Sequence, residues 1–335
     1  MFSDKTILIT GGTGTFGNAF VEKSLKENLF KKIIIFSRDE YKQFCMKKKF
    51  EKLFPENFQQ IRFLLGDVRD KNRLLLALKN VDYCIGASAL KRVDSIAYNI
   101  SESIKTNILG SMNVVDASIE CGLDKVVMIS SDKAVMPETI YGSHKLNLEY
   151  YSVFSNSFSG KTKVCSMRYG NIFNSRGSIA ELLLQDKKSP FYLTDNKMSR
   201  FFTEIETAVN LALSSLKNIV GGEIFIKKAK ACNIERLIKV ISPEREIKLS
   251  KITFAEKLHE RLIADMETGR IAFNGEDYII LPDVVPWTNS LYEFYDKIRT
   301  NINISDFISN TAEQLTDNEI LFMFNKEKQR LGLSD

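Results

Sequence analysis

Short apolar runs alternate with amphipathic stretches through the first half of the chain. The run IIIF at 33–36 is typical of a parallel strand that is covered on both faces. The runs that predict strands span residues 6–10, 32–37, 61–65, 83–87, 125–130 and 164–169. The stretches that predict helices between them span 17–26, 40–53, 71–78, 101–121 and 141–154. This alternation predicts βαβ units with right-handed crossovers, and therefore an α/β fold with a doubly wound parallel sheet.

After about Gly170 this alternation weakens, and short helices and loops follow, with strand-like runs at 223–227 and 277–281. We therefore expect a first domain over 1–170, a smaller lobe over 171–283 that is partly interleaved with it, and a C-terminal tail over 284–335. Within the tail, Thr316 and Glu319 have the spacing of a capping box ahead of an apolar stretch. This spacing predicts a terminal helix that begins at about Asp317.

Composition narrows the class of protein. The chain has 335 residues, of which 44% are hydrophobic and 10% aromatic, as is usual for a globular protein. The formal net charge of +5 is small for this length and fits an anionic small ligand. Since no basic tract is interleaved with aromatic residues, we expect no nucleic-acid partner. We also expect no signal peptide and no membrane segment, because no apolar run reaches about 18 residues.

The reactive residue types exclude further classes. The five cysteines are scattered and odd in number, which is typical of reduced thiols in a cytoplasmic protein, and no spacing indicates a metal site. His144 and His259 are the only histidines. A Ser-His-Asp hydrolase or a histidine-rich metal site would have to be built from these two, so we expect neither.

A glycine-rich loop lies between the first predicted strand and the first predicted helix. Gly11, Gly14 and Gly17, spaced three apart, allow a tight turn and a close approach of the backbone to a pyrophosphate at the helix N-terminus. This position in a strand–loop–helix unit predicts a Rossmann-like dinucleotide site. The loop residues expected to contact the cofactor are Gly11, Thr13, Gly14, Thr15, Phe16 and Gly17.

The end of the second predicted strand bears on the choice of dinucleotide. NAD-preferring folds usually place an acidic residue there, to bind the ribose hydroxyls. This chain instead has Ser37 and Arg38, which suit a 2′-phosphate. Asp67 and Val68 follow the third predicted strand and are expected to contact the adenine. The sequence therefore favours NADP, with NAD as the alternative cofactor.

Tyr141 and Lys145 are spaced i, i+4 and share one face of a predicted helix. A lysine ammonium beside a phenol is expected to lower the phenol pKa, so that the phenolate can take a hydroxyl proton while a hydride leaves the same carbon. The serine-rich end of the fifth predicted strand, at Ser130 and Ser131, lies just upstream. We therefore expect Tyr141 and Lys145 to be catalytic and also to contact the nicotinamide cofactor.

The motifs TGGTGTFG, FSRDE, GDVRD, ALKRV, KTNILG, SSDKA, YGSHK, RYGN and SRGS together resemble those of the UDP-N-acetylglucosamine 4,6-dehydratases. This family belongs to the extended short-chain dehydrogenases and serves capsular, flagellar and O-antigen sugar synthesis. The resemblance covers about residues 1–283. The tail residues Ser305, Asp306, Asn310, Thr311 and Leu315 resemble the C-terminal segment of the capsular branch, where this segment closes over the substrate or a neighbouring subunit.

The resemblance implies a lyase that oxidises C4 of the sugar, eliminates water across C5 and C6, and recycles its bound cofactor. Tyr141 would be the base at the C4 hydroxyl, Asp132 the acid at O6 and Lys133 the base at C5. Lys133 must then be neutral, so we expect a lowered pKa, and Asp132 must be protonated. The product would be a 4-keto-6-deoxy sugar, and the resemblance favours inversion at C5.

The resemblance also implies a nucleotide-sugar partner, held by the smaller lobe, and a homo-oligomer. Arginine binds phosphate through its planar fork of donors, so arginines after the sixth strand are candidates for the pyrophosphate. Lys91 follows the fourth predicted strand, at the sheet edge where α/β folds bind ligands. The substrate-binding candidates are Lys91, Asn171, Arg176 and Arg200.

Several positions depart from the family pattern. The family generally has Ala at Ser88, His or Gln at Arg92, Pro at Asp94 and Thr at Ser131, and Arg-Pro-Gly where this chain has Thr253, Phe254 and Ala255. Arg92 could replace the missing arginine, so the nucleotide and the sugar stay open. Two other classes also stay open: a nucleotide-sugar 4-epimerase or reductase, which would need Tyr141 but not the Asp132–Lys133 pair, and a non-catalytic cofactor-sensing protein.

Overall fold

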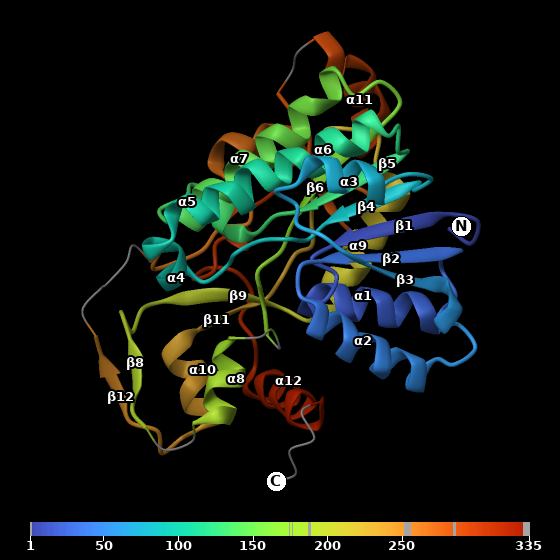
Figure 1. Cartoon of the computed structure of the whole chain (residues 1–335). Helices are drawn as coiled ribbons and strands as arrows, with labels where there is room; N and C mark the ends of the chain where they lie inside the picture. Colours follow the sequence, from blue (N-terminus) through green and yellow to red (C-terminus); the bar gives the residue numbers. More distant parts are fainter. Residues whose placement is uncertain are drawn as a thin grey trace.

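The computed structural model describes residues 2–173, 175, 177–186, 189–250, 256–283 and 286–330. A nine-stranded sheet with the order β13-β14-β10-β6-β5-β4-β1-β2-β3 forms the main lobe (Figure 1). All its neighbouring strands pair in parallel from β3 to β10, whereas β14 and β13 are antiparallel to their neighbours. Its strands are β1 (Thr6–Thr10), β2 (Lys32–Ser37), β3 (Ile61–Leu65), β4 (Tyr83–Gly86), β5 (Lys125–Ile129), β6 (Lys163–Arg168), β10 (Ile224–Ile226), β13 (Ile271–Phe273) and β14 (Tyr278–Ile280). The predicted doubly wound parallel sheet is confirmed.

Helices cover both faces of this sheet because alternate strand residues point to opposite sides. Ile7 and Ile9 of β1 join one buried cluster with residues of α1 and α9, whereas Leu8 joins a second cluster beneath α3, α6 and α7 (Figure 1). The main-lobe helices are α1 (Thr15–Lys26), α2 (Glu40–Leu53), α3 (Lys71–Ala77), α4 (Val93–Tyr98), α5 (Ile100–Ser103), α6 (Gly110–Glu120), α7 (Ile140–Phe154) and α9 (Ile205–Asn218). The strand patterns therefore specify a sheet buried between two helical layers.

The smaller lobe contains a three-stranded sheet and a separate strand pair. The sheet consists of β7 (Asn171–Ile172), β9 (Ser199–Thr203) and β11 (Ala231–Asn233), and the pair of β8 (Phe191–Leu193) and β12 (Ile247–Leu249). The helices α8 (Ile179–Gln185), α10 (Ile234–Ile241) and α12 (Asp317–Arg330) pack around a third apolar cluster in this lobe. The lobe lies below the carboxyl ends of the main strands in Figure 1.

The predicted strands of the first half agree with the structure to within one residue at each end. The predicted helix over 101–121 differs, because its middle, Ile104–Leu109, is a π-helical segment between α5 and α6. The strand-like runs at 223–227 and 277–281, which we expected in the smaller lobe, form β10 and β14 of the main sheet instead. The two lobes are thus interleaved along the chain.

The C-terminal segment contacts both lobes. Leu291 and Tyr295 of α11 (Asn289–Tyr295) are buried in the main-lobe core, whereas Ile320 and Phe324 of α12 are buried in the smaller lobe. The predicted capping box of α12 is confirmed: Glu319 N donates to Thr316 Oγ1 (3.2 Å), and Thr316 N donates to Glu319 Oε2 (2.8 Å).

None of the helices in the described ranges combines the length and the apolar character that crossing a membrane requires. All five cysteines are free thiols.

Candidate functional site

A cavity of about 1020 Å³ lies at the carboxyl ends of the main parallel strands, opposite the smaller lobe. Residues that directly follow or end the main strands line it, among them Gly11, Ser37, Ala87, Ser130 and Tyr169. Ile179 and Leu182 of α8 line the opposite wall. Open α/β sheets bind ligands at this edge, where the crossovers diverge to the two faces.

The glycine loop forms one end of the cavity, and all six of its predicted cofactor residues line it. Gly11 has a φ of +64°, and a Cβ there would lie 2.9 Å from the carbonyl oxygen of Ala87. A Cβ at Gly17 would overlap the backbone of Gly12. Gly14 caps α1 without a side chain, so the first amides of the helix face the cavity end as an anion site. Gly11 and Gly17 are therefore required by the backbone conformation of the turn and by the close approach of neighbouring backbone.

Ser37, Arg38, Asp67 and Val68, the other residues that the sequence assigns to the dinucleotide, also line the cavity. The Arg38 side chain is half exposed, and its Nη1 lies 3.5 Å from Asp67 Oδ2. Burial tends to raise the pKa of Asp67, but hydrogen bonds from Arg69 and the charges of Arg38 and Arg69 outweigh it and lower this pKa. The guanidinium of Arg38 is thus held at the rim while part of its surface stays open to a ligand.

Tyr141 and Lys145 lie on the first turns of α7, and both line the cavity. Lys145 Nζ donates to the carbonyl of Ile129 (2.6 Å) and lies 5.9 Å from the centroid of the Tyr141 ring. Burial lowers the pKa of Lys145 to about 8. Burial also raises the pKa of Tyr141, and the neighbouring Tyr169 and Asp132 add to this rise. The predicted lowering of the Tyr141 pKa is therefore wrong.

Asp132 and Lys133 begin a short 3-10 turn that starts after Ser130 and Ser131, the two residues that follow β5. Lys133 Nζ donates to Asn171 Oδ1 (2.8 Å) and to Asp132 Oδ1 (3.2 Å). Lys133 and Asn171 line the cavity, whereas the Asp132 side chain is fully buried. Ser131 also lines the cavity, and its hydroxyl donates to Asp132 Oδ1 (2.7 Å). The sequence pair thus forms one compact cluster that reaches the cavity through Lys133 and Ser131.

The protonation of Lys133 differs from our expectation. Burial tends to lower its pKa, but the carboxylates of Asp132 and Glu260 raise it more, against a smaller lowering by Arg200. The predicted lowering is therefore wrong, because two carboxylates neighbour the ammonium where we expected burial alone or a second cation to decide.

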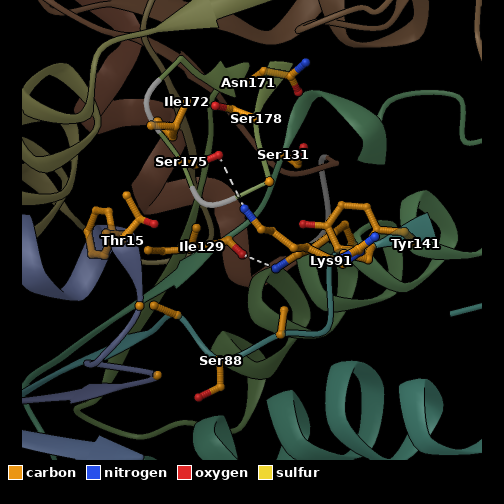
Figure 2. A pocket seen from close by; sticks show the side chains of 18 of the residues that line it. Thr15, Ser88, Lys91, Ile129, Ser131, Tyr141, Asn171, Ile172, Ser175 and Ser178 are labelled. Atoms are coloured by element: carbon orange, nitrogen blue, oxygen red, sulfur yellow. Dashed lines mark hydrogen bonds between the residues drawn. The ribbon is translucent and has the colours of Figure 1, made fainter. Parts of the chain in front are cut away.

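The structure brings together some of the substrate-binding candidates. Lys91 and Asn171 line the cavity, and Lys91 Nζ donates to Ser175 Oγ (3.3 Å; Figure 2). Arg200 is buried, donates to the carbonyls of Ser199 and Leu258, and is not among the residues that line this cavity. Arg176 lies outside the described residues.

Of the positions that depart from the family pattern, those within the described residues lie at the cavity. Ser88, Arg92, Asp94 and Ser131 line it, and Arg92 Nη2 pairs with Asp94 Oδ2 at 3.1 Å. Thr253, Phe254 and Ala255 lie outside the described residues.

Glu260 was not predicted from the sequence. Its Oε1 lies 3.6 Å from Lys133 Nζ, and its side chain is buried. In the same segment, residues 256–260, His259 Nδ1 is hydrogen bonded to Ser199 Oγ (2.8 Å). In the sequence, Glu260 is marked only by its place next to His259. No sequence spacing connects Glu260 to Lys133.

Comparison with known proteins agrees with this geometry. Residues 7–281 match the model of the polysaccharide biosynthesis protein family. The inverting UDP-N-acetylglucosamine 4,6-dehydratase of Campylobacter jejuni is 36% identical over 97% of this chain and 98% of its own length. The UDP-glucose 4-epimerase of Rickettsia rickettsii is 33% identical over 96% of this chain and 95% of its own.

Solved structures show the same fold. Pen from Bacillus thuringiensis is 30% identical and superimposes with a TM-score of 0.85, covering 97% of this chain and 100% of its own. The dTDP-glucose 4,6-dehydratase DesIV of Streptomyces venezuelae is 16% identical with a TM-score of 0.63. The chain therefore belongs to the polysaccharide biosynthesis protein family, in the group that includes the inverting UDP-N-acetylglucosamine 4,6-dehydratases.

Proposed function

We propose that the protein is a lyase, a nucleotide-sugar 4,6-dehydratase that acts on UDP-N-acetylglucosamine and inverts C5. The observation that carries the proposal is the Asp132–Lys133 cluster, which meets Asn171 in the cavity that Tyr141 and Lys145 also line. A 4-epimerase needs the Tyr141–Lys145 pair but has no use for a second acid and base. The product would be a 4-keto-6-deoxy sugar for a surface polysaccharide or a flagellar glycan.

Different residues at the cavity would carry out the successive steps of the reaction. Bound NADP would supply a hydride acceptor for C4 and return the same hydride to C6. Tyr141 takes the proton of the C4 hydroxyl, and the resulting ketone acidifies the proton at C5. Lys133 removes the C5 proton, and Asp132 provides the proton with which O6 leaves as water.

Lys133 must lose its own proton before it can act as a base. The Nζ–Oδ1 contact of 3.2 Å with Asp132 offers a direct route, because one proton transfer leaves a neutral amine and a protonated carboxyl. Both reactive forms thus arise from the ion pair in a single step. We propose this transfer as the event that readies the site for elimination.

Proton NMR in heavy water tests the function. We expect UDP-N-acetylglucosamine to lose one water and to give a 4-keto-6-deoxy product with deuterium at C5 and the inverted configuration. Interconversion of C4 epimers without loss of water would instead establish the epimerase. A dehydrated product with a retained C5 configuration would support the dehydratase and contradict only the proposed inversion.

The buried position of Asp132 gives Ser131 a role in the proposed proton delivery. The Ser131 hydroxyl contacts Oδ1 and lines the cavity, so it can give its proton to O6 while it takes that of the carboxyl. We expect Ser131→Ala to lower kcat at least about tenfold, within the range of general acid catalysis. Ser131→Thr keeps a hydroxyl and is the matched control, for which we expect nearly full kcat. Equal rates for the two variants would contradict the relay.

We propose NADP as the cofactor, with the 2′-phosphate at Arg38. A charge-assisted bond to a phosphate contributes about 1.5–3 kcal/mol. We therefore expect Arg38→Ala to raise the Kd of NADP at least about tenfold and to leave that of NAD within about twofold, as measured by calorimetry. Lys48→Ala, on the exposed face of α2, removes a cation outside the cavity and is the control. Equal losses for both dinucleotides would argue against a 2′-phosphate site.

Residues 1–170 would bind the dinucleotide, and residues 171–283 would hold the nucleotide sugar with Lys91 and Asn171 at the shared cavity. Of the tail helix, Phe324 is buried within its own lobe, whereas Leu321 and Phe322 stay exposed. We propose a homo-oligomer in the cytoplasm, in keeping with the five reduced cysteines. Analytical ultracentrifugation of the full chain tests the assembly.

A further inference from the structure

Glu260 is buried beside Lys133 and Asp132 but belongs to a segment far from them in the chain. Only 3% of the residue is exposed. Its Oε1 lies 3.6 Å from Lys133 Nζ and 3.9 Å from Arg200 Nε. Among the described residues, its second oxygen, Oε2, is buried and has no hydrogen-bond partner. A buried carboxylate is costly unless it is paired, so the cations that face it must account for its presence.

The backbone of Glu260 is held by a residue of the C-terminal segment. Glu260 N donates to Ser309 Oγ (2.9 Å), and Ser309 N donates to the Glu260 carbonyl (2.9 Å). Ser309 Oγ is also bonded to Ser199, at its hydroxyl (2.7 Å) and its carbonyl (3.1 Å). Ser309 thus fixes both backbone polar groups of Glu260 against β9, and it is itself fully buried.

The Lys133 ammonium has three acceptors around it. Asn171 Oδ1 lies at 2.8 Å, Asp132 Oδ1 at 3.2 Å and Glu260 Oε1 at 3.6 Å. Because an ammonium has three protons, these acceptors determine its direction as well as its charge. Asp132 follows β5 of the main lobe, whereas Asn171 begins β7 of the smaller lobe and Glu260 also comes from that lobe. Lys133 is therefore oriented from both lobes at once.

The other charged groups near this cluster oppose Glu260. Arg200 lowers the pKa of Lys133, and Lys257, which donates to the carbonyl of Val135, is a second nearby cation. The phenols of Tyr141 and Tyr169 lie on the Asp132 side. Without Glu260, Lys133 would face one carboxylate and one amide, with the Arg200 cation still in place.

We infer that Glu260 is a positioning residue for Lys133: it orients the ammonium toward the cavity and stabilises its charged form, and Ser309 of the C-terminal segment holds it there. The inference rests on the proposed function for its meaning in catalysis. A base that gains a proton from C5 becomes an ammonium, so a carboxylate placed beside it stabilises the state that follows proton removal. The contact itself does not depend on the identity of the substrate.

Chemical acetylation tests the contact without any substrate. The Lys133 side chain is 22% exposed and lines the cavity, so acetic anhydride can reach its neutral form. Each pKa unit changes the neutral fraction about tenfold. We expect Glu260→Gln, which keeps the shape of the side chain, to raise the acetylation rate of Lys133 near pH 8 roughly threefold to tenfold. The rate is followed by mass spectrometry of the Lys133 peptide, relative to exposed lysines of the same sample.

Two further variants separate this role from a general loss of structure. Asp265→Asn removes a carboxylate that is 65% exposed and pairs with Arg261, and it should leave the Lys133 rate unchanged. Ser309→Ala removes the hydroxyl that accepts from Glu260 N, and it should raise the rate in the same direction as Glu260→Gln, but less. It also serves if Glu260→Gln does not fold. An unchanged Lys133 rate in both Glu260→Gln and Ser309→Ala would overturn the inference, and so would a rate lowered in either.

The pH profile of turnover then links the contact to catalysis. With UDP-N-acetylglucosamine, Glu260→Gln should move the acidic limb of kcat to lower pH and reduce the plateau at least about tenfold, whereas a merely structural role would lower kcat at every pH. A normal profile together with faster acetylation would overturn the catalytic part of the inference. If the wild-type protein does not turn over this substrate, the proposed function fails while the acetylation result still decides the contact.

Discussion

Replacement of Lys133 by alanine should abolish elimination while leaving the oxidation of C4 in place. Lys133 is the one lysine that contacts both Asp132 and Asn171 among the described residues, and general base catalysis contributes about 10²–10⁴ to a rate. We therefore expect loss of the 4-keto-6-deoxy product by at least about a hundredfold. The measurement is proton NMR in heavy water, in which deuterium at C5 should vanish along with the product.

The oxidation half-reaction provides the internal control. Tyr141 and Lys145 lie on α7, which packs against the turn that carries Lys133, but Lys145 Nζ is held by the carbonyl of Ile129. They should therefore still take the C4 proton in Lys133→Ala. Transient absorbance of reduced cofactor after mixing with substrate would report it. Tyr141→Phe should lose this signal as well as the product. If Lys133→Ala kept full turnover, the assignment of the C5 base would be wrong.

Replacement of Arg168 by methionine should destabilise the protein by about 3–5 kcal/mol, because it leaves two buried carboxylates without their cation. Arg168 lies on β6 and is fully buried. It pairs with Glu149 of α7 (2.6 Å) and with Glu267 of the 3-10 segment that precedes β13 (2.8 Å). This ion triad joins α7 and the segment before β13 to β6. Urea unfolding measures the loss.

A matched control is Arg236→Met, which breaks an exposed pair with Asp317. Such pairs contribute about 0–1 kcal/mol, so only a small change in unfolding free energy is expected. If Arg168→Met cost no more than this control, the triad would not stabilise the fold. The triple variant with Glu149→Gln and Glu267→Gln should recover part of the loss, because no unpaired charge then remains buried.

The triad also predicts how stability depends on pH. Burial tends to raise the pKa of Glu267, but Arg168 outweighs it and lowers this pKa. A carboxylate with a lowered folded pKa stabilises the fold at pH values above its unfolded pKa of about 4.3. This contribution is lost as the pH falls through the folded pKa. The acid limb of the unfolding free energy should therefore be shallower in Glu267→Gln.

Local patterns in the sequence were sufficient for the strands β1 to β6 of the main sheet and for the glycine-loop end of the cavity. Strands such as β1 and β2 are runs of buried apolar residues, and the glycine loop must lie beside them because it follows β1 directly. The strands β8 and β12 have three residues each and no distinct apolar period, so tertiary pairing alone defines them.

The errors at the catalytic end share a physical cause. We predicted the pKa of Tyr141 from its neighbour Lys145, and that of Lys133 from the requirement that a base be neutral. Burial instead raises the pKa of Tyr141, and the carboxylates of Asp132 and Glu260 raise that of Lys133. Glu260 reaches Lys133 from the smaller lobe, and its position depends on a hydrogen bond to Ser309. Contacts over such sequence separations have no local signal. The residue types of a site can thus be predicted from the sequence, whereas its charge balance depends on contacts that only the structure shows.

The interleaving of the two lobes bears on how the chain can be divided. A fragment that ended at residue 170 would contain the whole cofactor loop, yet β6 would lose β10, its parallel neighbour. Val164, Cys165 and Met167, which are fully buried, would then lie at an open sheet edge, and such edges promote aggregation. The smaller lobe therefore cannot be exchanged between relatives by a single crossover: a functional chimaera needs at least two junctions, one on each side of β10.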